Sequence, residues 1–318
     1  MPISTTRQRV PPRLAQAGFV KTASHGLPHL LKAPLIGLNR WMAGLRAHEI
    51  RVAGHRLHYL DGGRGEPVLL LHGIFAEKDH WVDFARQLTR HHRVIVPDLP
   101  GFGESDRHED QHYGYAQQVP RLQALLDALA LPRVHVAGSS MGGALGALLA
   151  LASPERLATL AFVGAPHGLR SPVPSETDRM IDRGEAPLIA RDPGEFEAML
   201  ERLFEQRPWL PWPIRRAACA DAIDRAASNQ RIWQEHLADR HVLQLCLAGV
   251  QTPLLALWGR CDRVFHASGV RALRRQRPDA EIELLEDLGH LPMMEAPRAV
   301  AQRYRRFLVQ HLAGTTSP

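Results

Sequence analysis

Residues 138–142 read Gly-Ser-Ser-Met-Gly, the G-x-S-x-G spacing of a nucleophile elbow. They follow the short strand-like run 134–137 and precede the small, apolar stretch 143–152, which is the strand–turn–helix order that such an elbow requires. The flanking glycines let the backbone turn sharply and let strand and helix approach without Cβ clashes. The pattern predicts that Ser140 is a nucleophile with an exposed hydroxyl. The alternative is a glycine-rich turn without chemistry.

An acid and a base for this serine follow it in the chain, each in a loop after a strand-like run. Asp262 follows the run 253–259, and His290 follows the alternating run 281–285. Because the carboxyl ends of parallel strands meet at one edge of a sheet, both loops should lie beside Ser140. Neutral His290 would remove the hydroxyl proton, and Asp262 would orient the ring and stabilise the imidazolium. Either could singly be an ordinary turn residue, but their order and placement favour a Ser-Asp-His triad.

The turn at residues 72–75, His-Gly-Ile-Phe, follows the apolar run 67–71 and is expected to form part of an oxyanion hole. In a nucleophile-elbow enzyme one donor is a backbone N–H of such a turn, and the other is the N–H of the residue after the nucleophile. We assign these donors to the amides of Ile74 and Met141. His72 is interpreted as a structural residue that holds the turn, rather than as a second base.

From about residue 50 to residue 312 the chain resembles the α/β-hydrolase fold superfamily. The matching motifs are His-Gly at 72–73, Pro-Asp-Leu-Pro-Gly-Phe-Gly-Glu-Ser at 97–105, the elbow at 138–143, Gly-Arg-Cys-Asp at 259–262 and Gly-His at 289–290. Within the superfamily, the loop 72–81 with its Lys-Asp-His-Trp cluster resembles the bacterial lipase and monoacylglycerol-lipase-like branch. Ser171-Pro172 and Ser175-Glu176 also resemble that branch. Ser139 departs from it, since asparagine is expected before the nucleophile.

The resemblance implies an α/β fold, with a mostly parallel central sheet flanked by helices and a helical cap insertion. It also implies a serine esterase or lipase that cleaves carboxylic esters with apolar acyl chains, including monoacylglycerol-like substrates, through an acyl-enzyme. A carbon–carbon bond hydrolase of ring-cleavage products stays an alternative, because those relatives share the Ser-Met-Gly-Gly elbow. They resemble one another in a Trp after the catalytic histidine, where this chain has Leu291. A non-catalytic binding member of the fold is the third reading, which the intact triad disfavours.

With 318 residues, the chain is long enough for one large α/β domain with an insertion. We divide it into a basic N-terminal segment at 1–47, a core at 48–166 and 246–318, and a helical cap at 167–245. The first strands, near 49–52 and 56–60, are expected to form a hairpin. Cap helices are expected near 176–183, 194–206, 214–225 and 229–245. The large apolar side chains of the cap should mostly form its own small core, and the remainder should line an acyl pocket.

The N-terminal segment carries basic residues and no acidic residue before Glu49. Its apolar stretch, 27–45, is too short and too polar to span a membrane, and the segment does not have the pattern of a signal peptide. A basic amphipathic segment could lie on an anionic membrane surface. The alternative is a flexible tail that leads into a helix packed on the core. We therefore expect a cytoplasmic enzyme, with peripheral membrane contact through this segment left open.

Composition argues against several other functions. The net charge is +6, but the arginines are scattered and no nucleic-acid-binding motif accompanies them, so no nucleic-acid partner is expected. Arg271, Arg274, Arg275 and Arg277 are predicted to form the solvated face of a helix. The three cysteines lack C-x-x-C spacing, which disfavours disulfides and zinc. The histidine pair at 108 and 112 is interpreted as part of a polar loop, and neither a metal nor a cofactor is expected.

Overall fold

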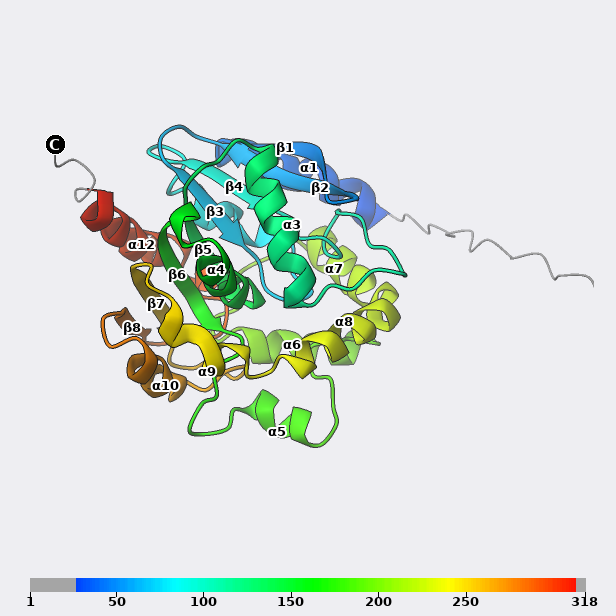
Figure 1. Ribbon diagram of the computed structural model, residues 1–318. Helices are drawn as coiled ribbons and strands as arrows, with labels where there is room; N and C mark the ends of the chain where they lie inside the picture. Colours follow the sequence, from blue (N-terminus) through cyan, green and yellow to red (C-terminus); the bar gives the residue numbers. More distant parts are fainter. Residues whose placement is uncertain (1–26, 313–318) are drawn as a thin grey trace, which may run out of the picture.

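The computed structural model describes residues 27–312, which form one sheet with helices on both of its faces (Figure 1). The eight strands run in the order β1-β2-β4-β3-β5-β6-β7-β8. β1 and β2 are antiparallel to their neighbours, and every later pair is parallel. The strands are β1 Leu45–Val52, β2 His55–Gly62, β3 Pro67–Leu71, β4 Arg93–Pro97, β5 Val134–Ser140, β6 Leu157–Pro166, β7 Leu254–Gly259 and β8 Glu281–Leu285. The predicted mostly parallel α/β sheet is confirmed.

The central strands are apolar along their whole length because both faces of the sheet are covered. Successive residues of a strand point to opposite faces, so Leu69 and Leu71 join one hydrophobic cluster whereas Val68 and Leu70 join another. The first cluster includes residues of α3 and α4, and the second includes residues of α2 and α12. These helices are α2 Val82–Ala85, α3 Tyr115–Ala128, α4 Met141–Ala152 and α12 Pro297–Leu312.

The predicted hairpin at the start of the sheet is confirmed. β1 pairs antiparallel with β2, with Val52 opposite His55. The two residues between them, Ala53 and Gly54, have φ angles of 47° and 79°. Positive φ at both central positions is typical of the type I′ turn that joins two-residue hairpins.

Five helices lie between β6 and β7, along one edge of the sheet (Figure 1). They are α5 Glu176–Asp182, α6 Pro193–Leu203, α7 Trp212–Asp224, α8 Ala226–Ala238 and α9 Val242–Cys246. The single helix predicted over 229–245 is therefore wrong. Arg240, at the break between α8 and α9, donates hydrogen bonds of 2.8 Å to Asp178 and 2.7 Å to Asp182. These ion pairs tie Arg240 to α5. Such a contact between distant segments cannot be seen in the local sequence pattern.

The first described helix, α1 Leu27–Met42, packs on α7 of the insertion. The Lys32 ammonium group lies 2.7 Å from the carboxylate of Asp221 on α7. Arg40 donates to both oxygens of Asp79, in η1 Lys78–Trp81. The earlier part of the predicted N-terminal segment, residues 1–26, lies outside the described residues. Of the helices in residues 27–312, none has the length and apolarity needed to span a membrane.

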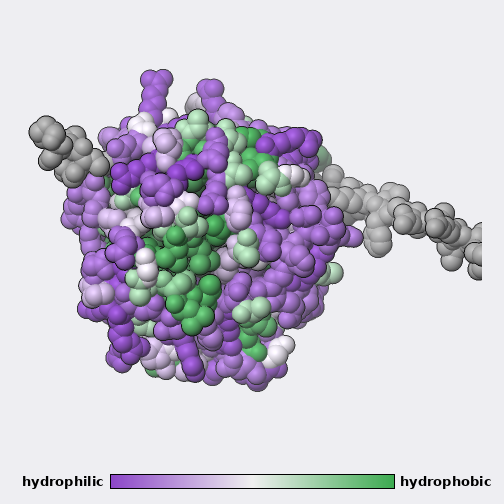
Figure 2. Space-filling model, viewed as in Figure 1, coloured by the Kyte–Doolittle hydropathy of each residue, from purple (hydrophilic) through white to green (hydrophobic). Residues whose placement is uncertain are grey.

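The remaining elements complete the C-terminal half and the surface. They are η2 Pro154–Arg156, η3 Leu247–Gly249, α10 Gly269–Gln276 and α11 Pro292–Glu295. Arg271, Arg274 and Arg275 are exposed on α10, as predicted, but Arg277 is only 4% exposed. The prediction that Arg277 lies on a solvated helix face is therefore wrong. The helix ends at Gln276, and the Arg277 guanidinium group donates to Asp279 and to the Thr252 carbonyl. Figure 2 shows a mainly hydrophilic surface with an apolar patch near the middle of the viewed face.

Candidate active site

Ser140 ends β5 in a backbone conformation that side-chain-bearing residues rarely adopt, with φ 54° and ψ −117°. α4 begins at the next residue, so the serine lies on the sharp turn between strand and helix. A Cβ atom at Gly138 would lie 2.3 Å from the Gly142 carbonyl carbon, and one at Gly142 would lie 2.2 Å from the Leu71 oxygen. Both glycines are therefore required by close backbone approaches, which explains the spacing of the motif.

Asp262 and His290 meet in the loops after β7 and β8. The His290 Nδ1 atom lies 2.9 Å from Oδ2 of Asp262. The other carboxylate oxygen accepts hydrogen bonds of 2.8 Å from the backbone N–H groups of Val264 and Phe265, which fixes its orientation. Because a carboxylate accepts at Nδ1, the Nε2 atom of neutral His290 is left as the basic nitrogen. His290 and Ser140 both line one cavity, so the structure brings all three predicted residues to the same edge of the sheet.

The turn that follows β3 lies directly against the serine. A Cβ atom at Gly73 would be 3.3 Å from the Ser140 Cβ atom. Within residues 27–312 the Ile74 N–H donates to no backbone carbonyl, and Phe75 is held at φ 57°. Met141 is the first residue of α4, and the first amides of a helix lack intrahelical acceptors. The amides of Ile74 and Met141 are therefore suited to be the oxyanion donors to which we assign them.

His72 uses both ring nitrogens to hold this turn. Its Nε2 atom accepts a hydrogen bond of 3.0 Å from the Leu99 N–H, so the proton lies on Nδ1, which is 2.8 Å from the Gly73 carbonyl oxygen. Burial lowers the pKa of His72, which favours the neutral ring that this arrangement needs. The structural role predicted for His72 agrees with these contacts.

A buried ion pair supports the same turn from behind. Lys78 and Asp98 are both fully buried, and the Lys78 ammonium group lies 2.6 Å from Oδ2 of Asp98. The Asp98 carboxylate also accepts hydrogen bonds of 2.7 Å from the Lys78 N–H and 2.8 Å from the Glu104 N–H. Gly103 packs so closely on this carboxylate that a Cβ atom there would lie 2.2 Å from its carbon. The pair thus joins the segment after the oxyanion turn to the loop 98–105.

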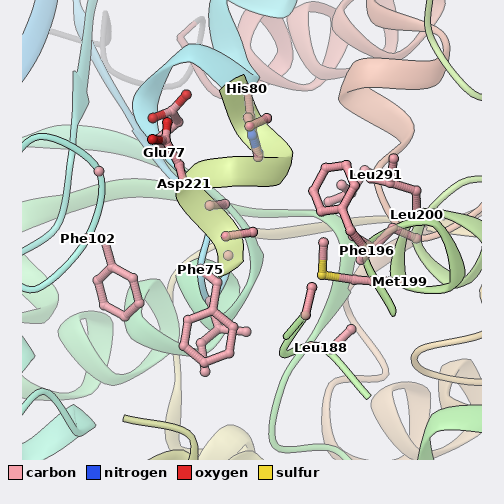
Figure 3. Close-up of a pocket in the computed structure, with 18 of the residues that line it drawn as sticks. Phe75, Glu77, His80, Phe102, Leu188, Phe196, Met199, Leu200, Asp221 and Leu291 are labelled. Atoms are coloured by element: carbon pink, nitrogen blue, oxygen red, sulfur yellow. The ribbon is translucent and has the colours of Figure 1, made fainter. Parts of the chain in front are cut away.

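The cavity that contains Ser140 and His290 is lined mainly by apolar side chains (Figure 3). Its apolar lining includes Phe75, Phe102, Leu188, Phe196, Met199, Leu200, Leu203, Phe204, Leu291 and Met294. Figure 3 shows Phe102 on the opposite side of the view from Leu200 and Leu291, with Glu77, His80 and Asp221 together at another end. A smaller pocket shares Ile74, Ser140 and Leu188 with this cavity.

The polar end of the cavity has shifted acid–base properties. Loss of hydration raises the pKa of Glu77 to about 7, and the nearby charges of Asp79 and Asp98 add to the rise. Burial also lowers the pKa of His80 to about 4, so its ring is neutral at pH 7. The sequence analysis missed both residues as parts of the cavity, although they lie within the loop 72–81 that it singled out.

Sequence reasoning also missed two arginines in the wall of the cavity, Arg107 and Arg225. Arg107 belongs to a polar loop, and Arg225 lies between α7 and α8. They are far apart in the chain, and no sequence motif relates them. Only the packing of the insertion against the loop 98–105 brings them together.

Comparison with known proteins assigns this chain to a family. The sequence model of the family described as alpha/beta hydrolase fold matches residues 66–208. Lipase 1 of Psychrobacter immobilis is 30% identical over 259 residues, which cover 80% of this chain and 81% of that protein. Monoacylglycerol lipase abhd6-B of Xenopus laevis is 27% identical and covers 77% of each chain. The solved structure of a bacterial membrane phospholipase A has a TM-score of 0.86 and 35% identity, and covers 89% of this chain and 92% of its own.

The chain therefore belongs to the α/β-hydrolase fold family. Within that family it falls in the lipase and esterase branch, and it is a carboxylic ester hydrolase. The resemblance that the sequence motifs indicated is confirmed in both respects.

The elbow glycine can be tested against a glycine in open surroundings. Gly142→Ala should lower the free energy of unfolding by about 1–3 kcal/mol, because its Cβ atom would force the backbone of the Leu71 carbonyl to move. Gly37→Ala is the control, because Gly37 lies within α1 and has nothing within 4 Å of its Cβ position. Alanine is the better helix former, so this variant should raise the free energy of unfolding by about 0.5–1 kcal/mol. Urea unfolding measures both variants. Equal stability of Gly142→Ala and the parent protein would contradict the close approach.

The buried ion pair makes a second prediction. Asp98→Ala removes the buried partner of the Lys78 ammonium group, which then keeps only the half-exposed Glu104 carboxylate at 2.5 Å, and it should lower the free energy of unfolding by about 3 kcal/mol, the lower end for a broken buried pair. Glu185→Ala removes the partner of Arg183 in an exposed pair, and should cost less than about 1 kcal/mol. Urea unfolding at neutral pH compares the two variants. Similar losses of unfolding free energy in both would contradict a stabilising role for Asp98.

Proposed function

We propose that Ser140, Asp262 and His290 form the catalytic triad of a hydrolase that cleaves carboxylic esters with apolar acyl chains. The observation that carries this proposal is the 2.9 Å contact between His290 and Asp262 beside a cavity shared with Ser140 at its strained elbow. In a Ser-His-Asp triad an acid fixes the second nitrogen of the base, and the contact between Asp262 and His290 supports that role for the pair.

The reaction follows from these positions. The Ser140 Oγ atom attacks the ester carbonyl carbon while His290 Nε2 takes the hydroxyl proton, and Asp262 stabilises the imidazolium. The amides of Ile74 and Met141 donate hydrogen bonds to the oxyanion of the tetrahedral intermediate, and loss of one such donor typically costs about 10²–10³ in rate. Collapse breaks the bond to the alcohol, which leaves with the proton from His290. Water, activated by the same nitrogen, then hydrolyses the acyl-enzyme.

The insertion at 167–245 acts as a cap that provides the acyl pocket. Phe196, Met199 and Leu200 of α6 line the cavity together with Leu188, which precedes that helix. Apolar lining with few polar groups is typical of sites that bind apolar ligands. In this proposal residues 48–166 and 246–318 form the catalytic core, and the N-terminal segment at 1–47 adds α1, which packs on α7, and the first residues of β1. Ester hydrolysis by relatives named lipase and monoacylglycerol lipase supports an acyl chain as the apolar part of the substrate.

The proposal predicts serine-dependent turnover that depends on chain length. Rates for p-nitrophenyl esters should rise from two carbons towards medium or long chains, because a longer chain buries more apolar surface in the cavity. Ser140→Ala should lower them to background with the fold retained, and a phosphonate reagent should label Ser140 alone. Turnover of a vinylogous diketone but not of any ester would favour carbon–carbon hydrolysis instead. Undiminished ester turnover by Ser140→Ala would refute the mechanism.

We further propose that α1 contacts an anionic membrane surface. Its exposed large apolar side chains are Leu30, Leu31, Leu35, Leu38, Trp41 and Met42. Lys32 and Arg40 of α1 are paired with Asp221 and Asp79, but residues 1–47 have further basic residues and no acidic residue, so an anionic surface complements the charge that remains. A relative of known structure is named a membrane phospholipase A, which supports lipid as the partner of this helix.

Vesicle binding tests this contact. The protein should cosediment with vesicles of phosphatidylglycerol and phosphatidylcholine, and Trp41→Ser should weaken the partition by about tenfold, since Trp41 is 74% exposed on α1 and would insert its ring. Leu245→Ser is the matched control, because Leu245 is 86% exposed on α9. The membrane contact is refuted if the parent protein stays in the supernatant, or if both variants bind equally well.

A further inference from the structure

The two arginines in the cavity wall are fixed by backbone carbonyls of one loop. Arg107 Nε donates a hydrogen bond of 2.6 Å to the Gly101 carbonyl, and Arg225 Nη1 donates one of 2.9 Å to the Gly103 carbonyl. Arg107 Nη1 also donates to Asn229 at 2.9 Å. Gly101 and Gly103 flank Phe102, a lining residue of the cavity. Both guanidinium groups are therefore held in place beside the same wall.

Neither of these arginines is neutralised by a carboxylate. Within residues 27–312, no carboxylate oxygen of an Asp or Glu lies as close as 4.0 Å to a nitrogen of either guanidinium group. The other basic side chains that line the cavity are paired, Lys32 with Asp221 and Arg215 with Glu197. Burial and, to a lesser extent, the neighbouring charge of Arg225 together lower the pKa of Arg107 to about 10. The Arg107 group stays charged at neutral pH, so this wall concentrates uncompensated positive charge.

Placing two like charges together at a partly buried wall is unfavourable unless an anion joins them. Arg107 Nη2 and Arg225 Nη2 make no hydrogen bond within the described residues that would use them otherwise. Guanidinium forks match the oxygens of a phosphate or carboxylate, and two forks from different elements can hold one such group. The two guanidinium groups therefore have the donors and the charge that an oxyanion requires.

We propose that Arg107 and Arg225 bind the phosphate of a single-chain lipid ester, so that the substrate class is a lysophospholipid rather than a neutral monoacylglycerol. This inference rests on the proposed function, because it places the phosphate in the cavity that contains Ser140. The acyl chain lies along the apolar side formed by Phe196, Met199 and Leu200, and the headgroup lies towards Phe102. Figure 3 shows these two sides of the cavity apart from one another, which suits a substrate with an apolar and a charged end.

Inhibition of the unmodified protein gives a first test that requires no variant. Hydrolysis of p-nitrophenyl butyrate is measured with dodecyl phosphate, dodecanol or inorganic phosphate as competitor. Dodecyl phosphate should inhibit at about tenfold lower concentration than dodecanol, the ratio expected from a charge-assisted hydrogen bond. Inorganic phosphate should inhibit far more weakly. Equal inhibition by dodecanol overturns the proposal, and inhibition by inorganic phosphate as strong as that by dodecyl phosphate overturns the lipid as the source of the anion.

Variants then test whether Arg107 and Arg225 bind the phosphate. Arg107→Gln and Arg225→Gln keep a side-chain N–H for the loop carbonyl but remove the charge. Each should raise KM for dodecanoyl lysophosphatidylglycerol by about tenfold and leave KM for monododecanoylglycerol within about twofold. Arg107→Lys should recover part of the loss, because the charge returns without the fork. Arg231→Gln is the matched control: Arg231 holds the carbonyls of His108 and Glu109 but does not line the cavity.

The readouts separate this inference from the proposed function. Thermal unfolding confirms that each variant is folded, and p-nitrophenyl butyrate turnover reports the triad alone. If butyrate turnover persists while KM for the two lipids changes equally, the anion site is refuted and the esterase stands. If Ser140→Ala retains butyrate turnover, the proposed function is refuted. A rise in KM with Arg231→Gln as large as with Arg107→Gln would assign the effect to overall charge and overturn the site.

Discussion

The buried ion pair between Lys78 and Asp98 is the interaction on which the site depends. The Asp98 carboxylate accepts from the Lys78 ammonium and amide groups and from the Glu104 amide, all within 2.8 Å. Its neighbour Leu99 donates to His72, which in turn bonds Gly73 of the oxyanion turn. A carboxylate in the interior is stable only when its lone pairs are satisfied, so these contacts fix the two loops relative to one another. The position of the turn to which we assign one oxyanion donor follows from that constraint.

The same loop also shapes the substrate cavity. Gly103 packs on the Asp98 carboxylate, and the carbonyls of Gly101 and Gly103 hold Arg107 and Arg225. Phe102, between these glycines, lines the cavity. Reaction geometry and headgroup recognition are thus coupled through one short segment. A change at Asp98 would therefore act on both, whereas a change at either arginine would act on recognition alone.

The site could be predicted where it depends on local sequence. The elbow at Ser140, the loops that carry Asp262 and His290 and the hairpin between β1 and β2 each have a short-range pattern, because backbone sterics fix them. Features that depend on tertiary contacts could not be predicted. The break between α8 and α9 follows from the ion pairs of Arg240 with α5, and Arg277 is buried because α10 ends before it. Arg107 and Arg225 come together only when the insertion packs on the loop 98–105.

The N-terminal helix α1 links an exposed apolar surface to the substrate cavity and to the residues around Lys78. α1 carries exposed apolar side chains, yet Lys32 lines the cavity through its pair with Asp221, and Arg40 bonds Asp79 next to the buried Lys78. A helix that lies on a lipid surface would thereby hold both the cap helix α7 and the segment behind the oxyanion turn. A single-chain lipid leaving such a surface presents an apolar chain and a charged headgroup together. The cavity offers an apolar side and an uncompensated pair of arginines for these two parts, and Ser140 lies in the same cavity, where the ester between them would be held.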